Sequence, residues 1–109
     1  MYYLKCKYTI SSAHSLNLDY DSPCKNLHGH NWEIIIHCKS NKLNENGMVI
    51  DFRYIKNIID ILDHQLINNY IKQPTAENIA KWLTDNIPFC YKIEVKETNN
   101  NSVVYEKDV

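Results

Sequence analysis

The sequence predicts a single α+β domain in which two helices pack on one face of a four-stranded antiparallel sheet. Segments of alternating polar and apolar residues near both ends of the chain predict the strands. Two amphipathic segments between them predict the helices. The order strand, strand, helix, helix, strand, strand is typical of this class. Because 109 residues suit one domain, we expect residues 1–109 to form a single unit.

Four segments are expected to be strands because large apolar or aromatic residues alternate with polar ones or form a β-branched run. They are residues 2–10, 32–39, 91–98 and 102–106. Residues 11–26 include Asp19, Ser22 and Pro23 and predict a loop. An Asn-rich turn over residues 41–47 and a short strand over residues 48–50 are further expectations. Because such a sheet has open edges and one helix-free face, we expect copies of the chain to associate through edges and uncovered apolar surface.

Asp51 is expected to cap the first helix, because its carboxylate can accept hydrogen bonds from the free amides of a first turn. One apolar stripe then recurs at three- and four-residue steps through Phe52, Ile55, Ile59, Leu62 and Leu66. The second helix is expected to begin at Pro74-Thr75, with Thr75 as its N-cap, and to end before Pro88.

The composition excludes several classes of function. With 12 Lys+Arg against 13 Asp+Glu the chain has no basic field, so we expect no nucleic-acid partner. Two glycines, Gly29 and Gly47, are too few for a GxGxxG fingerprint or a Walker A loop. No apolar run reaches the ~20 residues of a membrane span or resembles a signal peptide. We therefore expect a cytoplasmic protein without a membrane partner, whose four cysteines are free thiols, metal ligands or nucleophiles.

His28 and His30 are two residues apart, so on an extended strand both imidazoles point to the same side. Gly29 between them removes a side chain and allows close approach. His14 supplies a third imidazole. Three protein ligands leave a fourth position open, which is the catalytic pattern of zinc. The sequence therefore predicts a zinc site at His14, His28 and His30.

His37 and Cys38 are predicted to lie outside this site. On an unbroken strand His37 faces away from His28 and His30. A rise of ~3.3 Å per residue also puts it about 23 Å beyond His30, and Cys38 about 26 Å beyond.

Three further groups have alternative interpretations. Cys24 could be a fourth metal ligand, a thiolate acid/base beside a metal, or a buried structural cysteine. Asp63 could orient His64 for proton transfer, or the two could point ~100° apart on a helix as a surface pair. The carboxylate of Glu97, followed by Thr98, could pair with an NH-rich ring or simply end a solvated strand.

Six motifs in this order resemble those of the 6-pyruvoyl-tetrahydropterin synthase family, which includes the 6-carboxytetrahydropterin synthases. They are SSAH ending at His14, CKNLHGHNW from Cys24, GMVIDF from Gly47, LDH ending at His64 with Asn68, PTAENIAKWL from Pro74, and VKET ending at Thr98. Together they cover nearly the whole chain. By position, the resemblance implies zinc ligands at His14, His28 and His30, catalytic residues at Cys24, Asp63, His64 and Glu97, and a pterin anchor at Glu97 and Thr98.

The resemblance also implies the tunnelling fold, in which trimers close a twelve-stranded barrel and two trimers stack into a homohexamer. Active sites of the family lie between subunits, so Cys24 and the pair Asp63-His64 can come from different chains. The single arginine, Arg53, is unusual for an enzyme with a triphosphate substrate and shifts the expected phosphate contacts to lysines and partner subunits.

Three residues between Cys24 and His28 resemble the carboxytetrahydropterin branch of the family. The implied activity is a zinc-dependent carbon–carbon lyase that converts 7,8-dihydroneopterin triphosphate to 6-carboxy-5,6,7,8-tetrahydropterin, acetaldehyde and triphosphate in queuosine biosynthesis. One alternative is the pyruvoyl-forming reaction, which eliminates triphosphate and keeps all three side-chain carbons. Another is a non-catalytic, zinc-stabilised assembly module.

Overall fold

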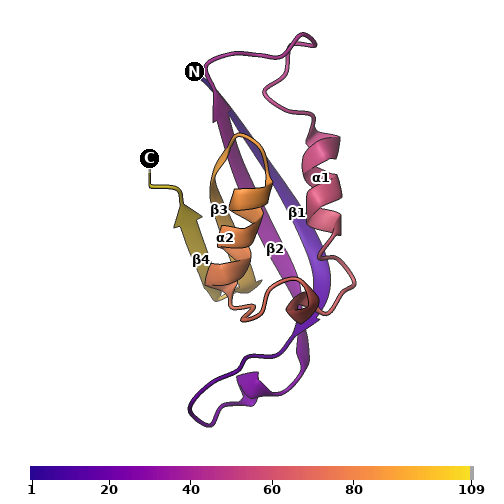
Figure 1. Ribbon diagram of the computed structural model, residues 1–109, viewed down its shortest axis with the longest axis vertical. Helices are drawn as coiled ribbons and strands as arrows, with labels where there is room; N and C mark the ends of the chain where they lie inside the picture. Colours follow the sequence, from indigo (N-terminus) through magenta and orange to yellow (C-terminus); the bar gives the residue numbers. More distant parts are fainter. Residues whose placement is uncertain (109) are drawn as a thin grey trace.

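Four antiparallel strands and two α-helices follow one another in the predicted order in the computed structural model, which describes residues 1–108 (Figure 1). Val109, the last residue of the predicted domain, lies outside the described residues. The strands are β1 (Tyr2–His14), β2 (His28–Ser40), β3 (Cys90–Thr98) and β4 (Asn101–Glu106), and they lie in that order in one sheet. The helices are α1 (Phe52–Asp60) and α2 (Ala76–Asn86). Both cover the same face of the sheet, so the predicted fold class is confirmed (Figure 1).

The core lies between the sheet and the two helices. Alternation along β2 puts Trp32, Ile34 and Ile36 on the helix-facing side, where each is fully buried. Ile55 of α1 and Leu83 of α2 pack into the same core. This layer fixes which side of each strand faces the helices, and therefore where the polar side chains at the strand ends point.

The helix-free face of the sheet is more polar than expected. Glu33 of β2 lies between Lys7 of β1 and Lys96 of β3, with each lysine Nζ 3.7 Å from a Glu33 carboxylate oxygen. Alternation thus places charged residues in part of this face, and association through uncovered apolar surface stays a prediction. The open edges of β1 and β4 remain as the physical reason for association.

Two strands extend further than predicted, and both extensions carry the histidine motifs. β1 continues to His14 and β2 already begins at His28, because the two polar stretches pair with each other: Ser12 lies opposite His30, and His14 opposite His28. The predicted loop therefore begins after residue 14. The short strand expected over residues 48–50 is absent from the described chain, since this segment turns, with the Met48 amide donating to the side chain of Asn44.

Both predicted helix caps are confirmed. The Asp51 carboxylate accepts from the Arg53 amide at 2.8 Å, and the Thr75 hydroxyl accepts from the Asn78 amide at 3.1 Å. The predicted stripe of α1 is too long, because the helix ends at Asp60 and Leu66 is exposed.

After α1 the chain turns and runs beside the outer edge of β1. The His64 amide donates to the Ser11 carbonyl at 2.8 Å, and the Ala13 amide to the Gln65 carbonyl at 3.1 Å. His64 has a positive φ of 55°, a backbone conformation that few non-glycine residues adopt and that ends any helical continuation. Of the helices in residues 1–108, none is long and apolar enough to span a bilayer.

Candidate metal centre

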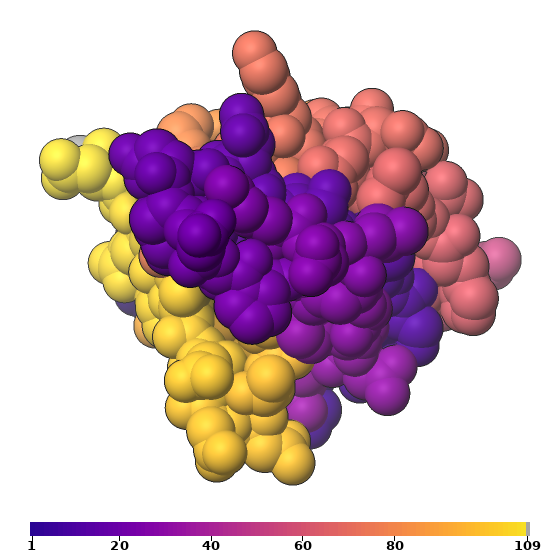
Figure 2. Space-filling model, turned by 90° about the horizontal axis from the view of Figure 1, so that it is seen from below, coloured from indigo at the N-terminus to yellow at the C-terminus, as the bar shows by residue number. Residues whose placement is uncertain are grey.

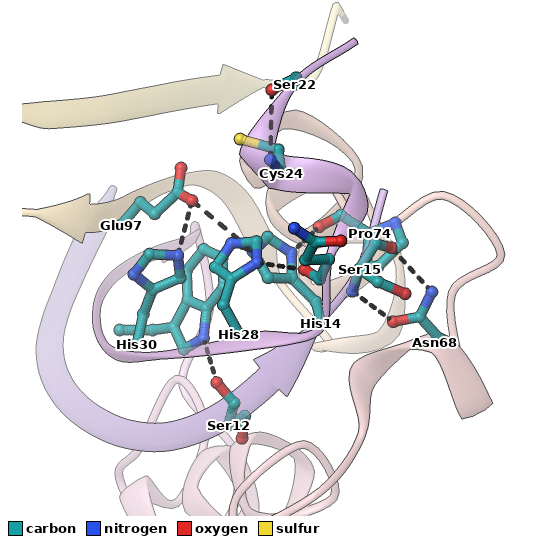
Figure 3. Close-up of polar contacts among 12 residues, drawn as sticks. Ser12, His14, Ser15, Ser22, Cys24, His28, His30, Asn68, Pro74 and Glu97 are labelled. Carbon is teal, nitrogen blue, oxygen red and sulfur yellow. Dashed lines mark hydrogen bonds and ion pairs between the residues drawn. The ribbon is translucent and has the colours of Figure 1, made fainter. Parts of the chain in front are cut away.

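Three histidines and one glutamate meet at the end of the sheet where β1 runs into the loop that leads to β2 (Figure 3). Pairing of the polar strand ends brings His14 of β1 opposite His28 of β2, and His30 follows on the same side. Glu97 reaches the group from the end of β3. One ligand atom from each residue lies within 4.8 Å of the other three, so the predicted histidines do come together.

Backbone carbonyls orient two of the rings. Nδ1 of His14 lies 2.7 Å from the Pro74 carbonyl oxygen, and Nδ1 of His28 lies 2.7 Å from the Asn26 carbonyl oxygen. A carbonyl only accepts, so each Nδ1 carries a proton, and Nε2 is the ring nitrogen that can present a lone pair to a metal ion. The two Nε2 atoms are 3.0 Å apart. Two lone pairs at that separation repel unless a cation lies between them, so the arrangement fits a bound metal ion.

His30 has an unpartnered ring nitrogen in the same place. Its Nε2 is 2.8 Å from Oε1 of Glu97, close enough for an ion pair, and Nε2 of His14 is 3.6 Å from the same oxygen. The direction of the His30 contact does not meet hydrogen-bond geometry, and within residues 1–108 this buried atom has no hydrogen-bond partner. A buried nitrogen of this kind needs an explanation, and a metal ion is the simplest one that also satisfies His14 and His28.

The surrounding protein buries His14 and packs against the rings. The His14 side chain is only 1% exposed, and this burial lowers its pKa, which favours the neutral form that binds metals. The Trp32 ring packs edge-to-face on His14 and His30, with centroids 4.8 and 5.0 Å away. Trp32 is itself held by a hydrogen bond from its Nε1 to the Ser12 carbonyl. Three imidazoles and one carboxylate are a donor set that zinc accepts.

Cys24 lies beside this group but is not part of it. It sits in η1 (Pro23–Lys25), a short 3₁₀ helix in the loop between β1 and β2, where its amide donates to the Ser22 hydroxyl at 3.2 Å. Figure 3 shows it on the loop above the histidines and Glu97. The four ligand atoms gathered within 4.8 Å do not include its sulfur. Cys24 is partly exposed, unlike the buried Cys38 and Cys90.

Asp63 and His64 contact each other as predicted for an orienting pair. Nδ1 of His64 lies 3.0 Å from Oδ1 of Asp63, which also accepts from the Ser11 amide at 2.9 Å. Partial burial opposes ionisation of the Asp63 carboxyl, but the Ser11 amide and the His64 ring outweigh it and lower the pKa of Asp63. The pair lies in a turn instead of at a helix end, which is why the two side chains can meet.

The Asp63-His64 pair is separate from Cys24 within one chain. The His64 side chain is 80% exposed and lines a hollow of about 590 Å³ at the outer edge of β1, together with Ser11, Gly29 and Asn31. Ser11 and Asn31 belong to the helix-free face, whereas the histidine group belongs to the opposite face. In residues 1–108 no hydrogen bond or ion pair joins Cys24 to Asp63 or His64.

The structure also shows where Thr98, His37 and Cys38 lie. Thr98 is the last residue of β3, and its hydroxyl accepts from the Asn100 amide at 3.2 Å in the turn that leads to β4. His37 faces the helix-free side next to Tyr91, and Cys38 is buried in the core opposite Cys90. The prediction that His37 and Cys38 lie outside the site is confirmed.

Glu97 is the residue whose position the sequence did not reveal. It was predicted as a catalytic residue and a substrate anchor, and not as part of the metal site, yet its carboxylate lies within 4.8 Å of the ligand atoms of the three histidines. The alternation in β3 could have indicated this position. Ile93 and Val95 face the core, so Glu97 faces the same side as the histidines.

A model of the 6-pyruvoyl tetrahydropterin synthase family matches residues 3–108, and the chain belongs to this family. A solved 6-pyruvoyl tetrahydropterin synthase from Caenorhabditis elegans superposes with a TM-score of 0.75 at 22% identity, covering 98% of this chain and 96% of that one, which shows the shared fold.

Two relatives are similar in sequence. The 6-carboxy-5,6,7,8-tetrahydropterin synthase of Synechocystis is 29% identical in an alignment that covers 96% of this chain and 93% of that protein. A relative from Pyrococcus horikoshii is 43% identical over 58 residues. That match covers 53% of this chain and only 36% of the archaeal protein.

Proposed function

We propose that this chain is a zinc-dependent 6-carboxy-5,6,7,8-tetrahydropterin synthase, with zinc held by His14, His28 and His30. The observation that carries the proposal is the pair of Nε2 atoms 3.0 Å apart, each turned inward by a carbonyl on its own Nδ1. The Synechocystis relative, which aligns over almost its whole length, carries the same activity in its name. The proposed substrate is 7,8-dihydroneopterin triphosphate, and the products are carboxytetrahydropterin, acetaldehyde and triphosphate.

The proposed roles follow from what each side chain can do. Bound zinc supplies Lewis-acid polarisation of the substrate's side-chain oxygens. Cys24, as a thiolate, takes and returns a proton at the side-chain carbon next to the pterin ring. His64, oriented by Asp63, exchanges protons between Cys24 and solvent, so that Cys24 can take a proton in one step and give one back in another. The carboxylate of Glu97 pairs with the NH groups of the pterin, next to Thr98, and can also join the relay.

The triphosphate must be bound without arginine from the same site. Arg53, the single arginine, lies in the first turn of α1, at the end of the helix away from the histidine group (Figure 1). We therefore propose that lysines and a partner subunit bind the phosphates. We further propose that the product feeds queuosine biosynthesis in the cytoplasm.

We propose a composite active site in a hexamer of two stacked trimers, because Cys24 and His64 do not meet within one chain. Light scattering at micromolar concentration is expected to give a hexamer, or at least a trimer. Mixing Cys24→Ala and His64→Ala chains is expected to restore part of the activity that each lacks, because some interfaces then carry both intact residues. A stable, active monomer would contradict the composite site.

Product analysis tests the proposed reaction directly. With dihydroneopterin triphosphate as substrate, mass spectrometry is expected to detect carboxytetrahydropterin and acetaldehyde in equal amounts, and chelation is expected to stop turnover. A pyruvoyl product that keeps all three side-chain carbons would assign the chain to the other branch of the family. No turnover, combined with unfolding on chelation, would indicate a zinc-stabilised assembly module instead.

A further inference from the structure

Two carboxamide side chains, those of Asn68 and Gln73, make hydrogen bonds to the backbone of the loop that carries Cys24. The loop leaves β1 directly after His14, and its first residue, Ser15, makes two hydrogen bonds to Asn68 (Figure 3). The Ser15 amide donates to Oδ1 of Asn68 at 3.0 Å, and Nδ2 of Asn68 donates to the Ser15 carbonyl at 2.9 Å. Asn68 lies in η2 (Ile67–Asn69), a 3₁₀ helix between the two α-helices.

Gln73 repeats this arrangement two residues further along the loop. The Asn17 amide donates to Oε1 of Gln73, and Nε2 of Gln73 donates to the Asn17 carbonyl, both at 2.9 Å. A carboxamide offers one acceptor and a donor group, so it can satisfy both polar groups of a backbone residue, as a neighbouring strand would. We call Asn68 and Gln73 the amide bracket.

The amide bracket lies between the segment that carries Cys24 and the segment that orients His14. Between its two contacts, the Leu16 amide donates to the carbonyl of Cys24 at 2.9 Å, so the bracketed segment in turn holds η1. On the other side, Gln73 precedes Pro74, whose carbonyl fixes the ring of the metal ligand His14. Figure 2 shows the chain around residues 15–30 lying across this end of the molecule, between the β3–β4 end and the segment that joins the helices.

We propose that Asn68 and Gln73 are positioning residues that set the distance from Cys24 to the metal-binding histidines. The loop contains no long regular element, so its place depends on these side-chain contacts and on the Leu16–Cys24 bond. The part of the proposal that concerns turnover rests on the proposed function. Asn68 has the larger share, because its bonds are partly buried whereas those of Gln73 are exposed to competing water.

The test compares Asn68→Ala and Gln73→Ala with a matched control in the zinc-loaded full chain. Asn44→Ala is the control, because the Asn44 side chain likewise makes two hydrogen bonds to backbone groups, accepting from the Asn46 and Met48 amides, in the loop at the far end of the molecule. In Asn68→Ala the amides of residues 15–17 are expected to exchange with deuterium roughly fivefold faster or more, while the core strands keep their protection. Bound zinc should stay at the wild-type level.

The kinetic readout separates positioning from general stability. A misplaced Cys24 is expected to lower kcat roughly 10- to 100-fold in Asn68→Ala with little change in KM, and less in Gln73→Ala. Asn68→Asp keeps the acceptor for the Ser15 amide but loses the donor, so its kcat should be intermediate. If the wild-type chain turns over no pterin, the proposed function fails, while the exchange experiment still tests the bracket.

Two results would overturn the proposal. One is wild-type exchange in residues 15–17 of Asn68→Ala. The other is an equal loss of kcat in Asn68→Ala and Asn44→Ala that follows their melting temperatures, because that pattern needs only a structural role.

Discussion

Replacing His28 with alanine is expected to remove bound metal and pterin turnover together. The substitution deletes one of the two Nε2 atoms that face each other at 3.0 Å, and it leaves the Asn26 carbonyl without the ring that it orients. Two imidazoles cannot hold zinc in the three-ligand arrangement of a catalytic site. Elemental analysis after zinc repletion should therefore give well under one ion per chain, with turnover reduced to the background of the metal-free protein.

His37→Ala is the matched control for this experiment. His37 lies on the same strand, β2, but it faces the helix-free side beside Tyr91. Loss of its ring should leave zinc content and turnover near wild-type values, apart from a modest change in stability. Equal zinc in the His28 and His37 variants would mean that the histidine group is not the metal site.

The alternating pattern of the strands was sufficient to predict the fold, because one buried face per strand leaves few ways to place two amphipathic helices. Boundaries were harder to predict. The polar stretches ending at His14 and beginning at His28 do not have the composition of strands, and only their mutual pairing extends β1 and β2 to these residues. Pairing is a long-range property, so tertiary contact decides it and local propensity does not.

The pairing of His28 with His30 could be predicted from spacing, since an HxH pair on a strand puts both rings on one side, and His14 was added as a histidine at the end of the first strand. Neither the proximity of Glu97 nor the bracketing by Asn68 could be predicted in this way. Glu97 reaches the histidines through the register of β3 against β2, and Asn68 through the turn after α1. Both depend on how distant segments pack, so the sequence indicated the three histidines and left their surroundings open.

Cys24→Ala is expected to keep its zinc and lose most of its turnover. The sulfur does not belong to the ligand atoms gathered within 4.8 Å, so removing it leaves the three imidazoles and their carbonyl partners unchanged. A positioned proton-transfer group contributes a factor of roughly 10²–10⁴ to a rate, and we expect kcat to fall by that amount. Pterin binding, measured by titration with a substrate analogue, should persist because Glu97 is intact.

Cys6→Ala distinguishes this effect from the loss of any thiol. Cys6 lies in β1 opposite Ile36, and burial raises the pKa of its thiol to about 11, so it stays protonated at neutral pH and is a poor proton acceptor. Its loss should therefore leave kcat unchanged. If Cys24→Ala instead loses zinc as His28→Ala does, the sulfur is a metal ligand. If Cys24→Ala keeps both zinc and full turnover, the thiol has no part in the reaction. Proton transfer is assigned to Cys24 if Cys24→Ala keeps its zinc and shows a large fall in kcat while Cys6→Ala does not. Only a residue that does not bind the metal can lower the rate without lowering the metal content.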